Sequence, residues 1–156
     1  MRLVFFFLLL ASSLFSCRER EIRQHEADIL AIENYLTQQG ITAERDPASD
    51  FFYSLYLDND RAYKPPRDKS LTMEVCYKAS LLDGTVVEET GSIPRRVELD
   101  DSIHGWRLAM PLMSKGEKML LFLPSRLAYG SESSALIPSN SVLIFDIELL
   151  EIYPQF

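Results

Sequence analysis

The chain has 156 residues, of which 47% are hydrophobic, which suits one domain with a real core and is too short for two full ones. Its formal net charge is −7, so it lacks the basic face that binding to phosphates requires, and nucleic acid is not expected as a partner. The two histidines, His25 and His104, have no second ligand at metal spacing, and the chain contains no serine elbow or glycine-rich phosphate loop. We therefore expect no metal, no cofactor and no hydrolytic nucleophile.

The first 16 residues have the pattern of an export signal. Arg2 is followed by an apolar run over 3–11, by small polar residues and by Cys17. The run is shorter than the roughly 20 apolar residues of a transmembrane helix. The tetrapeptide LFSC at 14–17 resembles a bacterial lipobox, which implies cleavage before Cys17 and attachment of lipid to it. We expect 1–16 to be a lipoprotein signal peptide, with an ordinary signal peptide as the alternative.

If Cys17 is lipidated, the protein is expected to be anchored to a membrane. Loss of Arg2 with the signal changes the net charge from −7 to −8, so anionic headgroups would repel the chain and the acyl chains would have to anchor it. Arg18 is not the aspartate that commonly retains lipoproteins at the inner membrane, which favours the periplasmic face of the outer membrane of a bacterial cell envelope. The other cysteine, Cys76, would then form no intramolecular disulfide and would serve as a small, partly buried apolar residue.

Residues 17–49 are predicted to form a helix and a linker. In REREIRQHEADILAIENYLTQQ (18–39) a narrow apolar stripe runs from Ile22 to Leu36, and Gly40 suits the C-terminal cap. The stripe leaves three roles open: a spacer from the membrane, packing on the domain, or packing on another copy, so the oligomeric state stays unknown. His25 lies near the stripe and is expected on a solvated helix.

From residue 50 to 156 the pattern predicts an α+β domain. In LTMEVCYKA (71–79) apolar residues alternate with polar ones, the period of a half-buried strand, and Asp83-Gly84 indicates a tight hairpin after it. Further strands are expected in four segments: DFFYSLYLDND (50–60, ending in a polar turn), RRVEL (95–99), EKMLLFLP (117–124) and SVLIFDIELLEI (141–152). These strands must bury their common face against the one short helix among them, which predicts a curved antiparallel sheet wrapped around it.

That short helix lies in SIHGWRLAMPLM (102–113) and carries the chain's single tryptophan, Trp106. Gly105 allows close approach to a neighbouring element, and Pro111 ends the helix after about two turns. We expect that the purpose of so short a helix is to present the Trp106 ring.

The order and spacing of four segments resemble the FKBP-type peptidyl-prolyl cis/trans isomerases. These segments are VCYKASLLDGTVVEET (75–90), SIHGW (102–106), LMSKGEKMLLFLPSRLAYG (112–130) and LIPSNSVLIFDIELLEI (136–152). The resemblance implies an FKBP-like half-barrel around the short helix, with a pocket between helix and sheet that accepts proline-containing polypeptides. Without it, each aromatic residue would be assigned to the core first.

The resemblance also implies which residues form the pocket. Trp106 would be its floor, and the backbone N–H of Ile103 and the hydroxyl of Tyr129 would bind substrate carbonyls. The implied catalytic residues are Tyr77, Glu88, Ile103, Trp106, Tyr129 and Phe145. The implied substrate-binding residues are Val87 and Ser102, together with Leu136 and Ile137 in a flap above the pocket.

One wall departs from the family pattern. Val87 and Glu88 stand where the family usually has Phe and Asp, and Arg95 follows Pro94 where an aromatic residue is common. We expect this wall to be shallower and more basic than usual. The first hypothesis is an isomerase that assists folding of exported proteins at the envelope. The alternatives are a catalytically weak FKBP-like chaperone or proline-segment binding module anchored to the membrane, and a structural lipoprotein with an incidental pocket.

Overall fold

The computed structural model describes the backbone of residues 2–56 and 71–154, and side chains within 18–56 and 71–153. Seven strands form one antiparallel sheet in the order β1-β2-β6-β7-β3-β4, with β5 paired to β3 beside β4. Their bounds are β1 (Glu44–Arg45), β2 (Phe52–Tyr56), β3 (Leu71–Ser80), β4 (Val86–Glu89), β5 (Arg95–Glu98), β6 (Lys118–Leu123) and β7 (Leu143–Pro154). The polar turn predicted at 57–60 lies outside the described residues.

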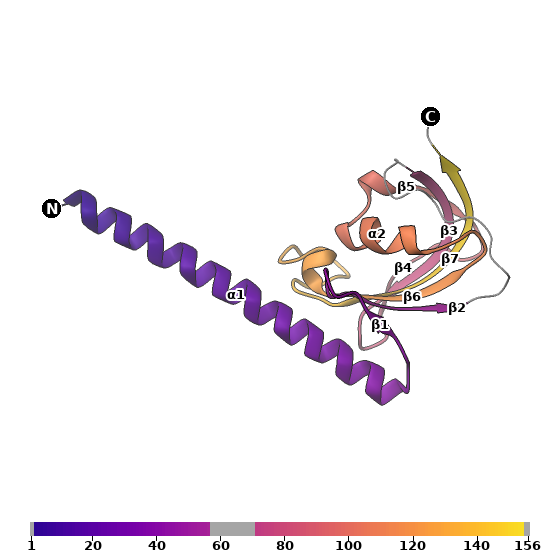
Figure 1. The fold of residues 1–156 in the computed structure, drawn as a ribbon, viewed down its shortest axis with the longest axis horizontal. Helices are drawn as coiled ribbons and strands as arrows, with labels where there is room; N and C mark the ends of the chain where they lie inside the picture. The colour runs from indigo at the N-terminus through magenta and orange to yellow at the C-terminus, as the bar shows by residue number, and fades with distance from the viewer. Residues whose placement is uncertain (1, 57–70, 155–156) are drawn as a thin grey trace.

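Helices lie on both sides of this sheet. The bounds are α1 (Arg2–Gln39), α2 (His104–Ala109) and three 3-10 turns, η1 (Leu99–Asp101), η2 (Met110–Leu112) and η3 (Ser125–Leu127). Figure 1 shows α2 within the curve of the sheet and α1 as a long rod beside the domain. The predicted α+β fold, a curved antiparallel sheet around one short helix preceded by an N-terminal helix, is confirmed.

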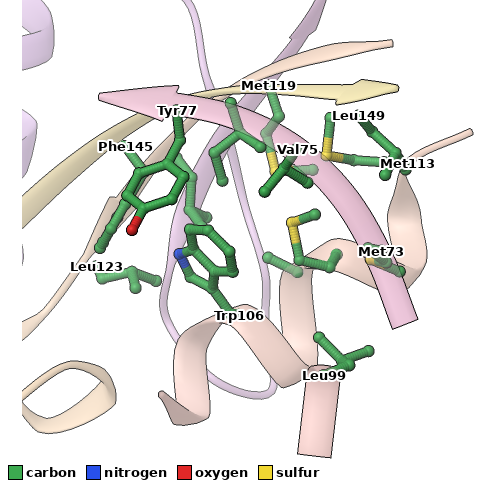
Figure 2. Packing of buried hydrophobic residues seen from close by; sticks show 14 of the residues in the cluster. Met73, Val75, Tyr77, Leu99, Trp106, Met113, Met119, Leu123, Phe145 and Leu149 are labelled. Carbon is green, nitrogen blue, oxygen red and sulfur yellow. The ribbon is translucent and has the colours of Figure 1, made fainter. Parts of the chain in front are cut away.

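The main core fills the concave side of the sheet. Along β3 every second side chain from Leu71 to Ala79 is buried, as its two-residue apolar period predicts. Inward-facing residues of β6 and β7 and the buried face of α2 complete the same cluster, part of which Figure 2 shows around Trp106. Cys76, on the opposite face of β3, is a free, partly buried thiol.

A close contact between α2 and β6 depends on Gly105. A Cβ atom at this position would lie 2.4 Å from Cδ1 of Leu123, whose side chain is fully buried. The helix then changes to the 3-10 form at Met110–Leu112, which contains Pro111. The close approach predicted for Gly105 is confirmed. The α-helix ends at Ala109, and Pro111 lies within the 3-10 turn that follows it.

The C-terminal half of α1 packs on the convex face of the sheet. Ile29, Ile32 and Leu36 form a second buried cluster with Phe122 of β6 and Ile144 of β7. This contact explains why β6 reads as an almost continuous apolar run, since both of its faces are covered. Of the three roles left open for the helix, packing on the domain is confirmed for this half, and the other two stay predictions.

Polar contacts reinforce this packing, and two of them were missed from sequence. Nε2 of His25 lies 3.0 Å from Oδ2 of Asp50, and only 17% of the His25 side chain is exposed, so its assignment to a solvated helix was wrong. Arg45 donates to the same carboxylate at 2.9 and 3.1 Å. Arg45 belongs to β1, an edge strand in the segment that was expected to be a plain linker.

Towards its N-terminus α1 extends past the sheet (Figure 1). It is one continuous helix from Arg2, so it includes most of the predicted signal segment 1–16. The side chain of Cys17 lies outside the described set. Among the described residues, no helix combines the length and apolar character needed to span a bilayer.

Candidate active site

Three aromatic rings meet on the concave side of the sheet, above α2. The ring of Tyr77 in β3 lies 5.1 Å from the indole of Trp106 at an interplanar angle of 83°, and the ring of Phe145 in β7 lies 5.5 Å from the same indole at 75°. Such edge-to-face arrangements are favourable pair geometries for aromatic rings. Figure 2 shows the Tyr77 and Phe145 side chains descending from adjacent strands towards the indole. The structure therefore brings together three residues that the sequence assigned to one site.

The hydroxyl of Tyr77 belongs to an ionic network. Nη1 of Arg95 donates to this hydroxyl at 2.7 Å and lies 2.5 Å from Oε1 of Glu88. Burial, followed by the nearby Glu88 carboxylate, raises the pKa of Tyr77 to about 12, so the phenol is neutral at physiological pH. The hydrogen bond to Glu88 raises the pKa of Arg95 above its ordinary value.

Because of this ion pair, the wall is less basic than the sequence led us to expect. The charge of Arg95 is matched by Glu88, and its guanidinium also lies 5.9 Å from the Tyr77 ring centroid. Arg95 was noted from sequence as a departure, yet its contact with Tyr77 was missed. Antiparallel pairing of β5 with β3 creates that contact across 18 residues of sequence.

The N-terminus of α2 presents Ile103 to the same region. Its carbonyl accepts hydrogen bonds from the N–H groups of Trp106 at 3.0 Å and Arg107 at 3.3 Å. Within the described part of the chain, no group accepts a hydrogen bond from the N–H of Ile103. An unpaired N–H beside the aromatic rings is a donor available to a ligand carbonyl.

Tyr129 lies on the turn that follows η3 and is 43% exposed. No described residue bonds to its hydroxyl. In the following loop Ile137 packs against the core and exchanges hydrogen bonds with Ser134, whereas Leu136 is 57% exposed. The loop thus offers one anchored and one exposed aliphatic side chain, the arrangement expected of a flap.

The two remaining predicted site residues, Val87 and Ser102, make different contacts. Val87 is partly buried and packs against the main core cluster. Ser102 instead donates its hydroxyl to the carbonyl of Glu98 at 3.0 Å, where it closes η1. In the described residues, no three His, Cys, Asp or Glu side chains are grouped so as to hold a metal ion.

Comparison with known protein families identifies this arrangement. Residues 63–150 match the family model described as FKBP-type peptidyl-prolyl cis-trans isomerase. This chain belongs to that family. The FKBP match includes all three rings, Glu88, Ile103, Tyr129, Leu136 and Ile137.

Individual FKBP proteins show the same similarity. The chain is 40% identical over 91 residues to the isomerase FkpA of Escherichia coli strain K12, which covers 57% of this chain and 33% of FkpA. It is 41% identical over 88 residues to FkpA of Buchnera aphidicola from Schizaphis graminum, which covers 55% of this chain and 35% of that protein. This chain therefore spans about a third of the length of these FKBP relatives.

Solved isomerase structures extend the likeness beyond the family segment. The crystal structure of Escherichia coli FkpA superposes with a TM-score of 0.69 at 29% identity, covering 96% of this chain and 68% of that one. An isomerase structure from Pseudomonas syringae gives a TM-score of 0.68 at 28% identity, covering 84% of this chain and 96% of that one. The coverage of 96% shows that the likeness to FkpA takes in much of α1 as well as the FKBP segment.

Proposed function

We propose that this protein catalyses cis/trans isomerisation of X-Pro peptide bonds and assists the folding of exported proteins at the bacterial cell envelope. The observation that carries the proposal is the perpendicular packing of Tyr77 and Phe145 on the Trp106 indole, next to the unpaired N–H of Ile103. Membership of the FKBP family supports the same activity.

The chemistry requires no nucleophile. Amide resonance creates a rotational barrier of about 18–20 kcal/mol, and X-Pro bonds interconvert in tens to hundreds of seconds without a catalyst. The twisted transition state loses that resonance and is less polar than the planar amide. An apolar, aromatic surface therefore favours the twisted form relative to water, and each tenfold acceleration needs only about 1.4 kcal/mol of differential binding.

Two donors would hold the flanking chain. The N–H of Ile103 and the hydroxyl of Tyr129 would bind substrate carbonyls, while the proline ring rests on Trp106. Leu136 and Ile137 would close over the ring, and Val87 would line the wall beneath them. Because the donors bind carbonyls rather than the rotating bond, they fix the geometry of the chain while that bond turns.

A protease-coupled isomerisation assay on X-Pro peptides tests the activity. We expect turnover by the wild-type chain and a large loss in the double variant Tyr129→Phe/Phe145→Ala. Trp106 fluorescence reports binding in the same samples, because it is the only tryptophan in the chain. Absence of wild-type turnover above the uncatalysed rate would reject catalysis.

A second candidate function is a binding module with little turnover. It is favoured by Val87, which has no aromatic ring where the family usually has phenylalanine, and by Arg95, which bonds to Glu88 and Tyr77 beside it. Under this alternative the chain acts as a membrane-anchored chaperone for proline-containing segments. Quenching of Trp106 by peptide without turnover would distinguish it from the isomerase.

The envelope location rests on the N-terminal segment. We propose that 1–16 is removed as a lipoprotein signal and that Cys17 carries the lipid, on the periplasmic face of the outer membrane. Domain 50–156 would then face its substrates, with 17–49 joining it to the anchor. Mass spectrometry of the mature N-terminus tests this: a Cys17→Ser variant should lose the lipid mass and membrane association together.

A further inference from the structure

Asp28 on α1 is a buried carboxylate whose main partner lies 97 residues further along the chain. Only 3% of Asp28 is exposed. Its Oδ2 atom accepts hydrogen bonds from both the N–H and the hydroxyl of Ser125, at 2.8 and 2.6 Å, and its Oδ1 accepts one from Gln24 at 2.7 Å. Buried carboxylates are tolerated only where such partners satisfy them. This residue therefore joins α1 to η3 by specific bonds.

Ser125 in turn organises the backbone around Tyr129. Its carbonyl accepts hydrogen bonds from the N–H groups of Ala128 at 2.9 Å and Gly130 at 2.8 Å, the two residues that flank Tyr129. The carbonyl of Gly130 accepts a further bond from the N–H of Asn140 at 2.7 Å. All hydrogen-bonding groups of Ser125 are thus used, two by Asp28 and one by the Tyr129 turn. Figure 1 shows this orange segment next to α1.

We propose that Asp28 is a positioning residue for Tyr129, so that docking of α1 sets the geometry of the active site. The proposal rests on the proposed function, in which the Tyr129 hydroxyl binds a substrate carbonyl. Asp28 does not touch substrate and acts through Ser125. Without Asp28, the N–H and hydroxyl of Ser125 would be buried with no partner, and the turn would shift to satisfy them.

The first test compares variants of two acidic residues on α1. Asp28→Ala removes the bonds to Ser125, whereas Glu33→Gln removes only the exposed ion pair between α1 and Arg45. We expect about a tenfold loss of kcat/KM for Asp28→Ala, because a small displacement of a binding group costs rate steeply, and no change for Glu33→Gln. Equal kcat/KM in Asp28→Ala and wild type would overturn the positioning role.

A double-mutant cycle separates positioning from general loosening of the fold. If Asp28 acts through the Tyr129 hydroxyl, adding Asp28→Ala to the Tyr129→Phe variant should reduce kcat/KM by less than about twofold. A full tenfold further loss in that background would show that Asp28 supports the fold and not this hydroxyl. Ser125→Ala, which removes only the hydroxyl donor, should show a smaller loss in the same pattern and serves if Asp28→Ala does not fold.

A spectroscopic measurement completes the test. In protein labelled with 13C-tyrosine, the ring resonance of Tyr129 should move in Asp28→Ala and stay in place in Glu33→Gln. An unmoved Tyr129 resonance would also overturn the proposal. Wild-type turnover and its loss in Tyr129→Phe are measured first and test the proposed function alone, so failure of the positioning role is recognised separately.

Discussion

The guanidinium of Arg95 donates a 2.7 Å hydrogen bond to the hydroxyl of Tyr77. The same nitrogen lies 2.5 Å from Oε1 of Glu88, so one cation links a residue of β3 to a residue of β4. The side chains of Arg95 and Glu88 are 56% and 43% exposed, whereas the Tyr77 ring is buried. The network therefore lies at the border between core and solvent, and under the proposed function we expect it to affect substrate binding more than folding.

Replacing Arg95 with methionine should separate these two effects. Arg95→Met keeps an unbranched side chain but removes the hydrogen bond to Tyr77 and the ion pair with Glu88. We expect kcat/KM to fall about two- to tenfold, the value of one hydrogen bond, while the free energy of unfolding changes by less than about 1 kcal/mol. Steady-state kinetics and urea denaturation measure the two quantities. A loss of stability without a loss of activity would contradict this assignment.

Tyr77 predicts a loss of stability at high pH. Because its pKa rises from 10.0 to about 12 in the folded protein, the neutral phenol contributes stability that is fully present below pH 10 and is lost as pH rises towards 12. The contribution amounts to at most about 3 kcal/mol. Urea denaturation from pH 8 to 12 should therefore show a steeper decline in wild type than in Tyr77→Phe. Parallel curves would show that Tyr77 titrates normally.

From the pKa of Asp50 we expect a loss of stability at acid pH. The hydrogen bond from His25, with Arg45 as a further partner, holds the pKa of Asp50 below its ordinary value of 3.8. The ionised carboxylate thus contributes stability that is present above pH 3.8 and is lost as pH falls below it. Asp50→Asn should remove this part of the acid sensitivity. Amide hydrogen exchange along α1 below pH 4 measures it, and identical pH profiles for both proteins would exclude it.

The packing of α1 is testable with a matched pair of substitutions. Ile32 is fully buried against the convex face, whereas Leu30 on the same helix is 58% exposed. Ile32→Ala should reduce the free energy of unfolding by about 2–4 kcal/mol, since it leaves a cavity, and Leu30→Ala by less than about 0.5 kcal/mol. Similar values for both would mean that α1 does not dock on the sheet in solution.

Gly105 offers a test of the contact between α2 and β6. Although alanine favours helix formation, Gly105→Ala would place Cβ 2.4 Å from Leu123 and should destabilise the protein by about 1–3 kcal/mol through overpacking. Pairing it with Leu123→Ala provides the control, because the truncated neighbour makes room for the new methyl group. We expect the double variant to be more stable than the sum of the single changes predicts. Additive losses, measured by urea denaturation, would place the strain elsewhere.

The sequence alone determined the fold class and grouped three aromatic residues. Alternation in β3 and β7, the Asp83-Gly84 turn and the short helix before Pro111 are local patterns, and local patterns predict strands, turns and helix ends. The order of these motifs also resembled one family closely enough to assign Tyr77, Trp106 and Phe145 to one site. The structure places their rings in contact.

Only the tertiary structure decided what joins distant segments. The docking of α1, the burial of Asp28 against Ser125 and the contact of Arg95 with Tyr77 all depend on which faces meet after folding. A carboxylate on a predicted helix is solvated in most proteins, so no pattern along the chain distinguishes Asp28 from its neighbours. Asp28 bonds to Ser125, which lies 97 residues away, and its burial makes such a partner necessary.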